Sequence, residues 1–380
     1  MRVGLELLVN DITSLRGKYI GVITNHTGVL SDFVHVIDLF LKFHLNIRVV
    51  FAPEHGFRGD ALEGSSVKSY VDERTGLPVV SVHGGSYSPP EDILRKLDVV
   101  IYDIQDVGAR FYTYISTLFY VLESAGKVGV EVLVLDRPNP ITGLHVEGPV
   151  LEPGYRSFVG VWYIPVRYGM TVGELALLFN EEADLGADLR VVKMEGWRRR
   201  MWFDETGLPW VPPSPNMPSL DAAVVYPGTC LIEGTNVSEG RGTAKPFELI
   251  GAPWIDEYEL VEELKSLPVK GVKYRPATFT PWRSKYSGEV CRGVQVYVIN
   301  RDVFEPVKFG LGLVWTIKRL YPDKFEFVKR GNKYYFDLLI GCGDTRELIE
   351  RGCDFDDLVD LCNRGLDSFS KIRGKYLLYY

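Results

Sequence analysis

The chain has 380 residues, 46% of them hydrophobic, and a formal net charge of −7 at pH 7. Single hydrophobic cores stop growing near about 250–300 residues, so this length predicts a globular protein with two domains. The acidic balance argues against nucleic-acid binding, since the densest basic run is only Trp197-Arg198-Arg199-Arg200. No apolar stretch reaches the roughly 18 residues that span a membrane, so we expect neither nucleic acid nor a membrane as a partner.

The start of the chain enters what reads as folded sequence and lacks the apolar segment of a signal peptide, so we expect a cytoplasmic protein. Its five cysteines are scattered, with no Cys-x-x-Cys pattern, and predict free thiols. A disulfide bond between Cys342 and Cys353 is an alternative to free thiols at these two positions. Nothing in the sequence indicates an oligomeric state.

The first 140 residues alternate between apolar runs and segments with helical spacing. The runs, which predict strands, cover residues 18–23, 48–52, 77–82, 97–102 and 131–135. The segments with helical spacing cover residues 33–44, 91–97 and 113–125. This alternation predicts an α/β fold with a mostly parallel, doubly wound sheet that carries helices on both faces.

Further elements follow. Thr171 and Glu174 have the spacing of a capping box, which predicts a helix to about residue 182. A strand is expected at 189–194, a rigid proline-rich connection at 209–221, a glycine-rich loop at 234–242, a helix at 256–264 and a half-buried strand at 293–299. From about residue 270 an alternating strand pattern appears and the density of aromatic residues rises, and all six histidines lie before this point. We therefore predict a first domain of residues 1–245 and a smaller α+β domain of residues 246–380.

Polar side chains follow the apolar runs and predict one shared pocket, because ligands bind beyond the carboxyl ends of parallel strands. Glu54 and His55 follow the second run and are placed to move protons. Partial burial of Glu54 would raise its proton affinity, as a general acid needs. The alternative is structural: His55 packs, and Glu54 pairs with Arg58.

A second cluster, residues 103–114, is dense in hydrogen-bonding groups and favours recognition of a polyhydroxylated or charged ligand. Arg110 is suited to grip a carboxylate with two hydrogen bonds. The alternative is a helix cap at Thr113 with an Asp106–Arg110 ion pair. Two further polar stretches stand out. In residues 136–140, prolines fix the backbone and direct the side chains of Asp136 and Asn139. The alternative is that this stretch is only a rigid turn. The other, residues 233–243, predicts either a substrate-covering loop or a plain surface loop.

Signatures of several enzyme classes are absent from the sequence. It has no Gly-x-Gly-x-x-Gly after the first strand, no Walker A motif, no Gly-x-Ser-x-Gly and no His-Glu-x-x-His. We therefore expect no cofactor. A metal site built from His26, His55, His83 and Asp103 at the strand ends remains an alternative.

Six motifs, in unbroken order, closely resemble those of the NamZ (YbbC-like) family of exo-β-N-acetylmuramidases. They lie at residues 24–28, 53–56, 103–114, 135–140, 213–218 and 238–243. The resemblance implies a Rossmann-like domain with a smaller auxiliary domain and an active site in the cleft between them. It also implies release of N-acetylmuramic acid from the non-reducing end of peptidoglycan-derived fragments. Two positions depart from the family: Tyr168, where we expect His, and His83, where an aromatic residue such as Tyr is more usual.

By this resemblance Glu54 matches the leading candidate for a catalytic carboxylate. We expect it to act as general acid, with His55 tuning or orienting it. Glu239 or Asp106 would be the base or nucleophile, or would orient the N-acetyl group, and participation by the substrate's own amide stays open. The residues expected to bind an acidic substituent of the sugar, such as the lactyl carboxylate, are Arg58, Arg110 and Arg241. The other expected substrate contacts are Asn25, His26, Asp103, Gln105, Tyr112, Asp136, Asn139, Tyr168 and Asn216.

Together with this resemblance, the sequence predicts an exo-acting glycoside hydrolase that needs no metal or cofactor. Its substrate would be a small saccharide ending in a β-linked N-acetylmuramic acid or a related N-acetylhexosamine or acidic sugar. Two other classes remain open. One is a metal-dependent hydrolase that uses the strand-end histidines and aspartate. The other is a non-catalytic sugar-binding protein.

Overall fold

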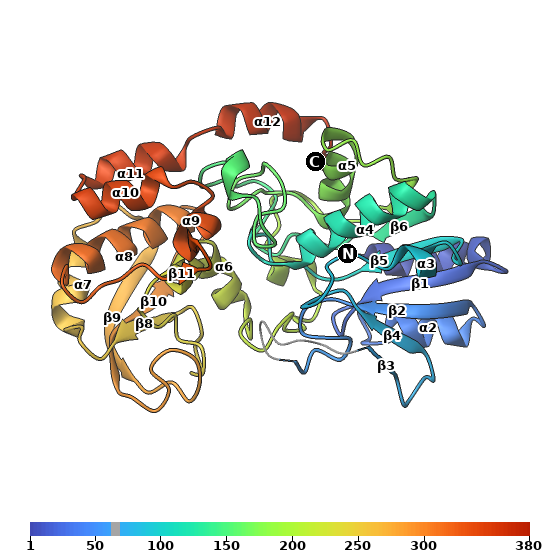
Figure 1. The fold of residues 1–380 in the computed structure, drawn as a ribbon, viewed down its shortest axis with the longest axis horizontal. Helices are drawn as coiled ribbons and strands as arrows, with labels where there is room; N and C mark the ends of the chain where they lie inside the picture. Colours follow the sequence, from blue (N-terminus) through green and yellow to red (C-terminus); the bar gives the residue numbers. More distant parts are fainter. Residues whose placement is uncertain (62–68) are drawn as a thin grey trace.

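The computed structural model describes residues 1–61 and 69–380 and shows two domains side by side (Figure 1). The first is built on a seven-stranded sheet with the order β3-β4-β2-β1-β5-β6-β7. All neighbouring strands are parallel except β3, which runs antiparallel to β4. The strands are β1 (Tyr19–Thr24), β2 (Asn46–Ala52), β3 (Tyr70–Val71), β4 (Pro78–Ser81), β5 (Val99–Asp103), β6 (Glu131–Leu135) and β7 (Leu189–Val192).

Helices cover both faces of this sheet because its strands are apolar on both sides. Along β5, Val99 and Ile101 join one core cluster, with residues of α1 and α2, whereas Val100 and Tyr102 join the other, with residues of α4 and α5. Side chains of a strand alternate between faces, so an unbroken apolar run needs two covering layers. The helices are α1 (Gly4–Leu8), α2 (Val36–Lys42), α3 (Glu91–Leu94), α4 (Tyr114–Val128) and α5 (Val172–Glu182).

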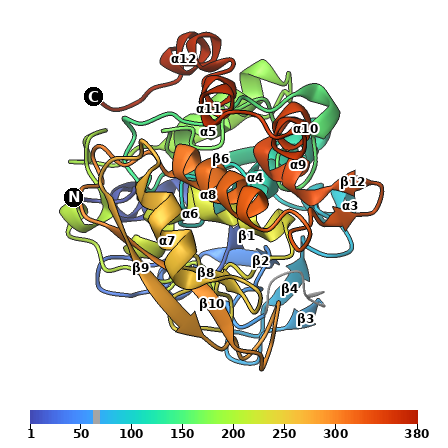
Figure 2. The ribbon, with the colours of Figure 1, turned by 90° about the vertical axis from the view of Figure 1, so that its left-hand side faces the viewer.

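The second domain contains a three-stranded antiparallel sheet of β8 (Leu249–Ala252), β10 (Cys291–Val298) and β9 (Val272–Phe279), in that order. Helices α6 (Leu220–Thr229), α7 (Glu257–Lys265) and α8 (Pro306–Leu320) pack on it and on each other (Figure 2). Helices α6 and α8 cross so closely that a Cβ at Gly228 would lie 1.8 Å from the carbonyl oxygen of Pro306. Helix α6 packs on α8, so at least one helix that packs with the second domain lies before residue 245. The predicted domain boundary at residue 245 stays a prediction.

The last third of the second domain is a short ribbon followed by helices. The ribbon pairs β11 (Lys329–Arg330) with β12 (Lys333–Tyr334). The helices are α9 (Tyr335–Ile340), α10 (Asp344–Arg351), α11 (Phe355–Cys362) and α12 (Leu366–Gly374). Helix α12 leads the chain back to the first domain (Figure 1), where the Leu378 N–H donates to the Glu174 carboxylate of α5.

The predicted α/β class, with a mostly parallel sheet and a second domain, is confirmed. The capping box of α5 is present: the Thr171 hydroxyl accepts from the Glu174 N–H at 3.2 Å, and the Glu174 carboxylate accepts from the Thr171 N–H at 3.0 Å. All five cysteines are free. Within residues 1–61 and 69–380, no helix combines the length and apolar character needed to cross a bilayer.

Candidate active site

A pocket of about 420 Å³ lies where the two domains meet, a volume suited to a small ligand. The first domain contributes loops that follow β2, β4 and β5, and the second contributes a turn after α6 and the region of the ribbon. Its polar and aromatic lining includes Glu54, His55, His83, Tyr87, Tyr112, Thr113, Phe158, Asn216, Tyr226, Glu233, Arg241, Arg330 and Tyr335.

Glu54 is held in this pocket by groups from two neighbouring elements. The hydroxyl of Thr113, the residue before α4, donates to Glu54 Oε2 at 2.5 Å. His83 Nε2 lies 3.7 Å from Glu54 Oε1, with the Glu54 side chain 14% exposed. Strands β2 and β4 are parallel neighbours, so the residues that follow them meet at one edge of the sheet. Glu54 is thus oriented by the protein and lines the pocket.

His83, rather than His55 as predicted, is the imidazole placed against the Glu54 carboxylate. His55 also lines the pocket, but its Nδ1 lies 2.9 Å from the carbonyl oxygen of Ala61, and its φ is +70°. That hydrogen bond and the left-handed backbone indicate a role in shaping the turn after β2. The sequence signal for His83 is its position directly after a predicted strand, which places it among the polar residues expected in the shared pocket.

Among the described residues, a second carboxylate in the pocket lining is that of Glu233, which was not one of the predicted site residues. It lies in the 3₁₀ turn η4 (Cys230–Gly234), and its Oε1 accepts from Arg241 at 2.6 Å and from the Cys230 thiol at 3.3 Å. Arg241 also places its Nε 3.1 Å from Glu239 Oε1. Residues 233–243 are largely buried, so this stretch forms a wall of the pocket and not the substrate-covering loop that we considered.

Glu239 lies behind that wall. Its other oxygen, Oε2, is 3.0 Å from Lys285 Nζ, which also donates to the carbonyl oxygens of Ile232 and Val237. Burial alone would raise the pKa of Glu239, but Lys285 and Arg241 outweigh it and leave the pKa below its ordinary value. Glu239 is therefore an ionised counter-ion that organises the turn and does not line the pocket.

Asp106 is also outside the pocket lining. It accepts hydrogen bonds at Oδ2 from the Tyr168 hydroxyl and, at 2.7 Å, from the Gly108 N–H. Burial raises the pKa of Asp106 to about 6, although both donors act in the opposite direction. The two predicted site residues Asp106 and Tyr168 thus contact each other, and neither lines the pocket.

Two arginines predicted to bind an acidic substituent are engaged elsewhere. Arg58 forms an ion pair with Asp72 at 2.7 Å. Arg110 is fully buried, and its guanidinium donates to three backbone carbonyl oxygens, including that of Leu339 at 2.8 Å. This contact ties the first domain to α9, so Arg110 stabilises the junction of the domains instead of gripping a carboxylate.

The central strand ends do not open into the pocket, because Arg137 fills the space between them. Its Nε and one terminal nitrogen lie 2.6 and 2.9 Å from the two carboxylate oxygens of Asp103, and it also donates to the Val29 carbonyl at 3.0 Å. The strand order reverses at β1 and β5, where a doubly wound sheet usually binds its ligand. In this chain a buried ion pair occupies that position, so the five strand ends do not converge on one cleft.

The remaining predicted contacts near these strand ends bind the protein's own groups. Gln105 Nε2 donates to the carbonyl oxygens of Asp106 and Pro138, and Asn139 Nδ2 donates to that of Met170. Asn25 Oδ1 accepts from Thr27, and His26 Nε2 is 2.7 Å from the carbonyl oxygen of Pro212. Over residues 1–61 and 69–380, no three His, Cys, Asp or Glu side chains are grouped to hold a metal ion, so the alternative metal site is not assembled.

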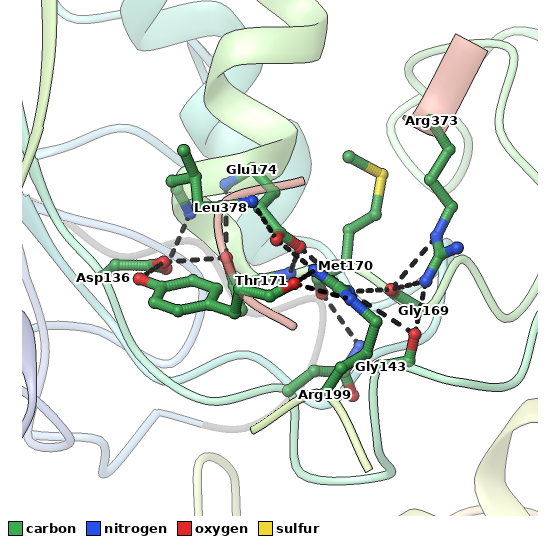
Figure 3. Close-up of polar contacts among 12 residues, drawn as sticks. Asp136, Gly143, Gly169, Met170, Thr171, Glu174, Arg199, Arg373 and Leu378 are labelled. Atoms are coloured by element: carbon green, nitrogen blue, oxygen red, sulfur yellow. Dashed lines mark hydrogen bonds and ion pairs between the residues drawn. The ribbon is translucent and has the colours of Figure 1, made fainter. Parts of the chain in front are cut away.

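Asp136 is the anchor of the C-terminal segment (Figure 3). Its Oδ2 accepts from the hydroxyls of Thr171 at 2.8 Å and Tyr379 at 2.5 Å, and its Oδ1 accepts from the Gly173 N–H at 2.8 Å. Beside it, Glu174 pairs with Arg199 and accepts from the Leu378 N–H. Arg373 of α12 donates to the carbonyl oxygens of Gly143 and Gly169. The polar end of β6 therefore holds the C-terminal segment.

Of the predicted residues, the structure brings together Glu54, His55, Tyr112, Asn216 and Arg241 in the pocket lining. Glu233 was within reach of sequence reasoning, because it lies in a stretch singled out for its carboxylates. Arg330 and Tyr335 belong to no motif, and only the packing of the second domain places them there.

Two sequence models of one family account for nearly the whole chain. The model described as exo-beta-N-acetylmuramidase NamZ, N-terminal, matches residues 20–221, and its C-terminal counterpart matches residues 224–379. The chain belongs to the NamZ family. This membership confirms the predicted family and the prediction of a glycoside hydrolase.

Comparisons with individual proteins agree with this assignment. The chain is 51% identical to the peptidoglycan beta-N-acetylmuramidase NamZ of Bacillus subtilis (strain 168), over all of this chain and 91% of that protein. Two crystal structures of DUF1343 family proteins from Bacteroides fragilis NCTC 9343 are similar over 100% of this chain. One has a TM-score of 0.92 at 36% identity and is covered over 99% of its length. The other has a TM-score of 0.78 at 31% identity and is covered over 98%.

Proposed function

We propose that this chain is an exo-acting β-N-acetylmuramidase that releases N-acetylmuramic acid from the non-reducing end of a peptidoglycan-derived saccharide. The observation that carries the proposal is the pocket between the domains, which is lined by Glu54 from the first domain and Glu233 from the second. Glycosidases commonly use such a pair of carboxylates at the scissile bond. Membership of the NamZ family and the 51% identity to the Bacillus subtilis muramidase support the same reaction.

Glu54 is the general acid of this proposal. The Thr113 hydroxyl donates to Oε2 and so fixes the orientation of the carboxyl group, which in this proposal passes its proton to the glycosidic oxygen. His83 Nε2, 3.7 Å from Oε1, is positioned to exchange a proton with the carboxylate after the bond has broken. An acid held by the protein on one oxygen presents the other in a defined direction, which lowers the entropic cost of proton transfer.

Glu233 is the second carboxylate. Its ion pair with Arg241 holds the carboxylate in place, where its negative charge would stabilise positive charge at the anomeric carbon in an oxocarbenium-like transition state. In this position it acts as the base that activates water or as the nucleophile. Glu239 and Asp106, the earlier candidates, lack access to the pocket, so they enter this proposal only through the residues that they hold in place.

The test is hydrolysis of an aryl β-glycoside of N-acetylmuramic acid by the wild type and by Glu54→Gln. We expect the variant to lose activity by about 10²–10⁴-fold, the usual contribution of a general acid. Glu91→Gln is the matched control, since Glu91 is an exposed glutamate on α3 that pairs with Arg95. Wild-type turnover by Glu54→Gln would contradict the role of Glu54.

The same assay separates the two other classes. Binding of the sugar without turnover by the wild type would indicate a sugar-binding protein. Loss of turnover on chelation, with recovery on addition of Zn²⁺ or Mn²⁺, would indicate a metal-dependent hydrolase. The cytoplasmic location expected from the sequence stays a prediction.

A further inference from the structure

Two cationic side chains line the pocket among the residues that the structure describes, and they differ in their partners. Arg241 contacts both Glu233, at 2.6 Å, and Glu239, at 3.1 Å. The Arg330 guanidinium contacts the Tyr335 ring and forms no hydrogen bond or ion pair with any residue of 1–61 or 69–380. Among the residues that the structure describes, no carboxylate therefore pairs with Arg330, whereas Arg241 is paired with two.

The second domain holds Arg330 in place without using its donors. Arg330 pairs with Lys333 in the β11–β12 ribbon. The ribbon is attached to the turn that carries Glu233, because the Val328 N–H donates to the Gly234 carbonyl at 2.9 Å. The Arg330 guanidinium carbon lies 3.5 Å from the centre of the Tyr335 ring. Stacking on an aromatic face fixes the plane of a guanidinium and leaves its N–H edges open to a ligand.

We propose that Arg330 is a specificity-determining residue that binds a carboxylate on the terminal sugar. In the proposed reaction, on which this inference rests, that group is the lactyl carboxylate of N-acetylmuramic acid, which N-acetylglucosamine lacks. An acidic sugar must enter a pocket that already contains Glu54 and Glu233, so it needs a cation of the protein as its partner. A planar guanidinium binds a carboxylate through two parallel hydrogen bonds.

The other arginines considered for this task are already engaged. Arg58 is paired with Asp72, Arg110 donates to backbone carbonyls, and Arg241 is held by two glutamates. Moving any of them toward a ligand would leave a buried carboxylate or buried carbonyls without a donor, which is costly. Arg330 can bind the ligand without breaking a polar contact of the protein.

The test compares Arg330→Gln with the wild type on three aryl β-glycosides: N-acetylmuramic acid, its lactyl amide, and N-acetylglucosamine. For the muramic acid substrate we expect kcat/KM to fall by about 10- to 100-fold, the usual effect of losing a hydrogen bond to a charged group. The change should appear mainly in KM, because the contact is remote from the reacting bond. The two uncharged substrates should change by less than about threefold, and Arg330→Lys should restore part of the loss.

Lys333→Gln is the matched control, since Lys333 lies on the same ribbon but donates to the Gly154 carbonyl and does not line the pocket. Equal losses on all three substrates would mean that Arg330 only supports the pocket, and no loss on the muramic acid substrate would also overturn the proposal. Calorimetric titration of free N-acetylmuramic acid and its lactyl amide into both proteins provides a second readout without turnover. If the wild type hydrolyses none of the substrates, the proposed function fails. The titration then still decides whether Arg330 binds the carboxylate.

Discussion

The hydroxyl of Tyr379 donates a hydrogen bond of 2.5 Å to Asp136 Oδ2, and this joins two residues 243 positions apart. Asp136 is fully buried at the end of β6, whereas Tyr379 is the penultimate residue. Together with the contacts of Arg373 and Leu378, this bond attaches the C-terminal segment of the chain to the first domain (Figure 3). The two walls of the pocket are thereby connected at a site remote from the chemistry.

Tyr379→Phe should lower the free energy of unfolding by about 1–3 kcal/mol, because Asp136 loses a donor in a buried position. Tyr380→Phe is the control: Tyr380 is 99% exposed, and its substitution should change the free energy of unfolding by less than about 0.5 kcal/mol. Urea unfolding followed by tryptophan fluorescence measures both. Equal stability of the two variants would show that the C-terminal contact adds nothing to the fold.

Glu233 and Glu239 should respond differently to removal of their charge. Glu233→Gln should reduce kcat by about 100-fold or more while leaving most of the stability, because Glu233 lines the pocket. Glu239→Gln leaves Lys285 partly unpaired in the wall, so it should lower the free energy of unfolding by about 3–5 kcal/mol. Steady-state kinetics per folded molecule and thermal unfolding distinguish the two. A kcat loss confined to Glu239→Gln would restore Glu239 as the second carboxylate.

The stability of the protein should depend on pH through Asp106. Burial raises the pKa of this carboxyl from an unfolded value of about 3.9 to about 6 in the folded state. A raised pKa means that the stability advantage of wild type over Asp106→Asn is fully present below pH 4. It is lost as the pH rises through about 6, by about 2–3 kcal/mol in total. Tyr168→Phe removes a donor to the carboxylate and should shift this transition to higher pH.

Urea unfolding of wild type and Asp106→Asn at intervals from pH 4 to pH 8 measures this dependence. A constant difference between the two proteins over the whole range would show that Asp106 titrates alike in the folded and unfolded chains.

Much of the first domain could be read from local patterns. The apolar runs that predict β1, β2, β4, β5 and β6 each became a strand, because a run that is apolar on both faces is stable only between two layers of helices. The capping box at Thr171 predicted the start of α5 for an equally local reason. The motifs around Glu54 and Asp103 were sufficient to recognise the family.

The sequence by itself therefore determined the doubly wound sheet, the edge that carries the polar residues and the place of Glu54 on that edge. It did not determine which polar residues face the ligand, because that depends on which find partners within the protein. Arg137 pairs with Asp103, Tyr168 with Asp106, and Lys285 with Glu239. Buried polar groups need such partners, and a residue that is paired in this way does not face the ligand. A sequence motif does not show which of its polar residues are paired and which line the pocket. Glu233 and Arg330 share a pocket with Glu54 only when the two domains pack together, so the tertiary structure alone decided the second half of the site.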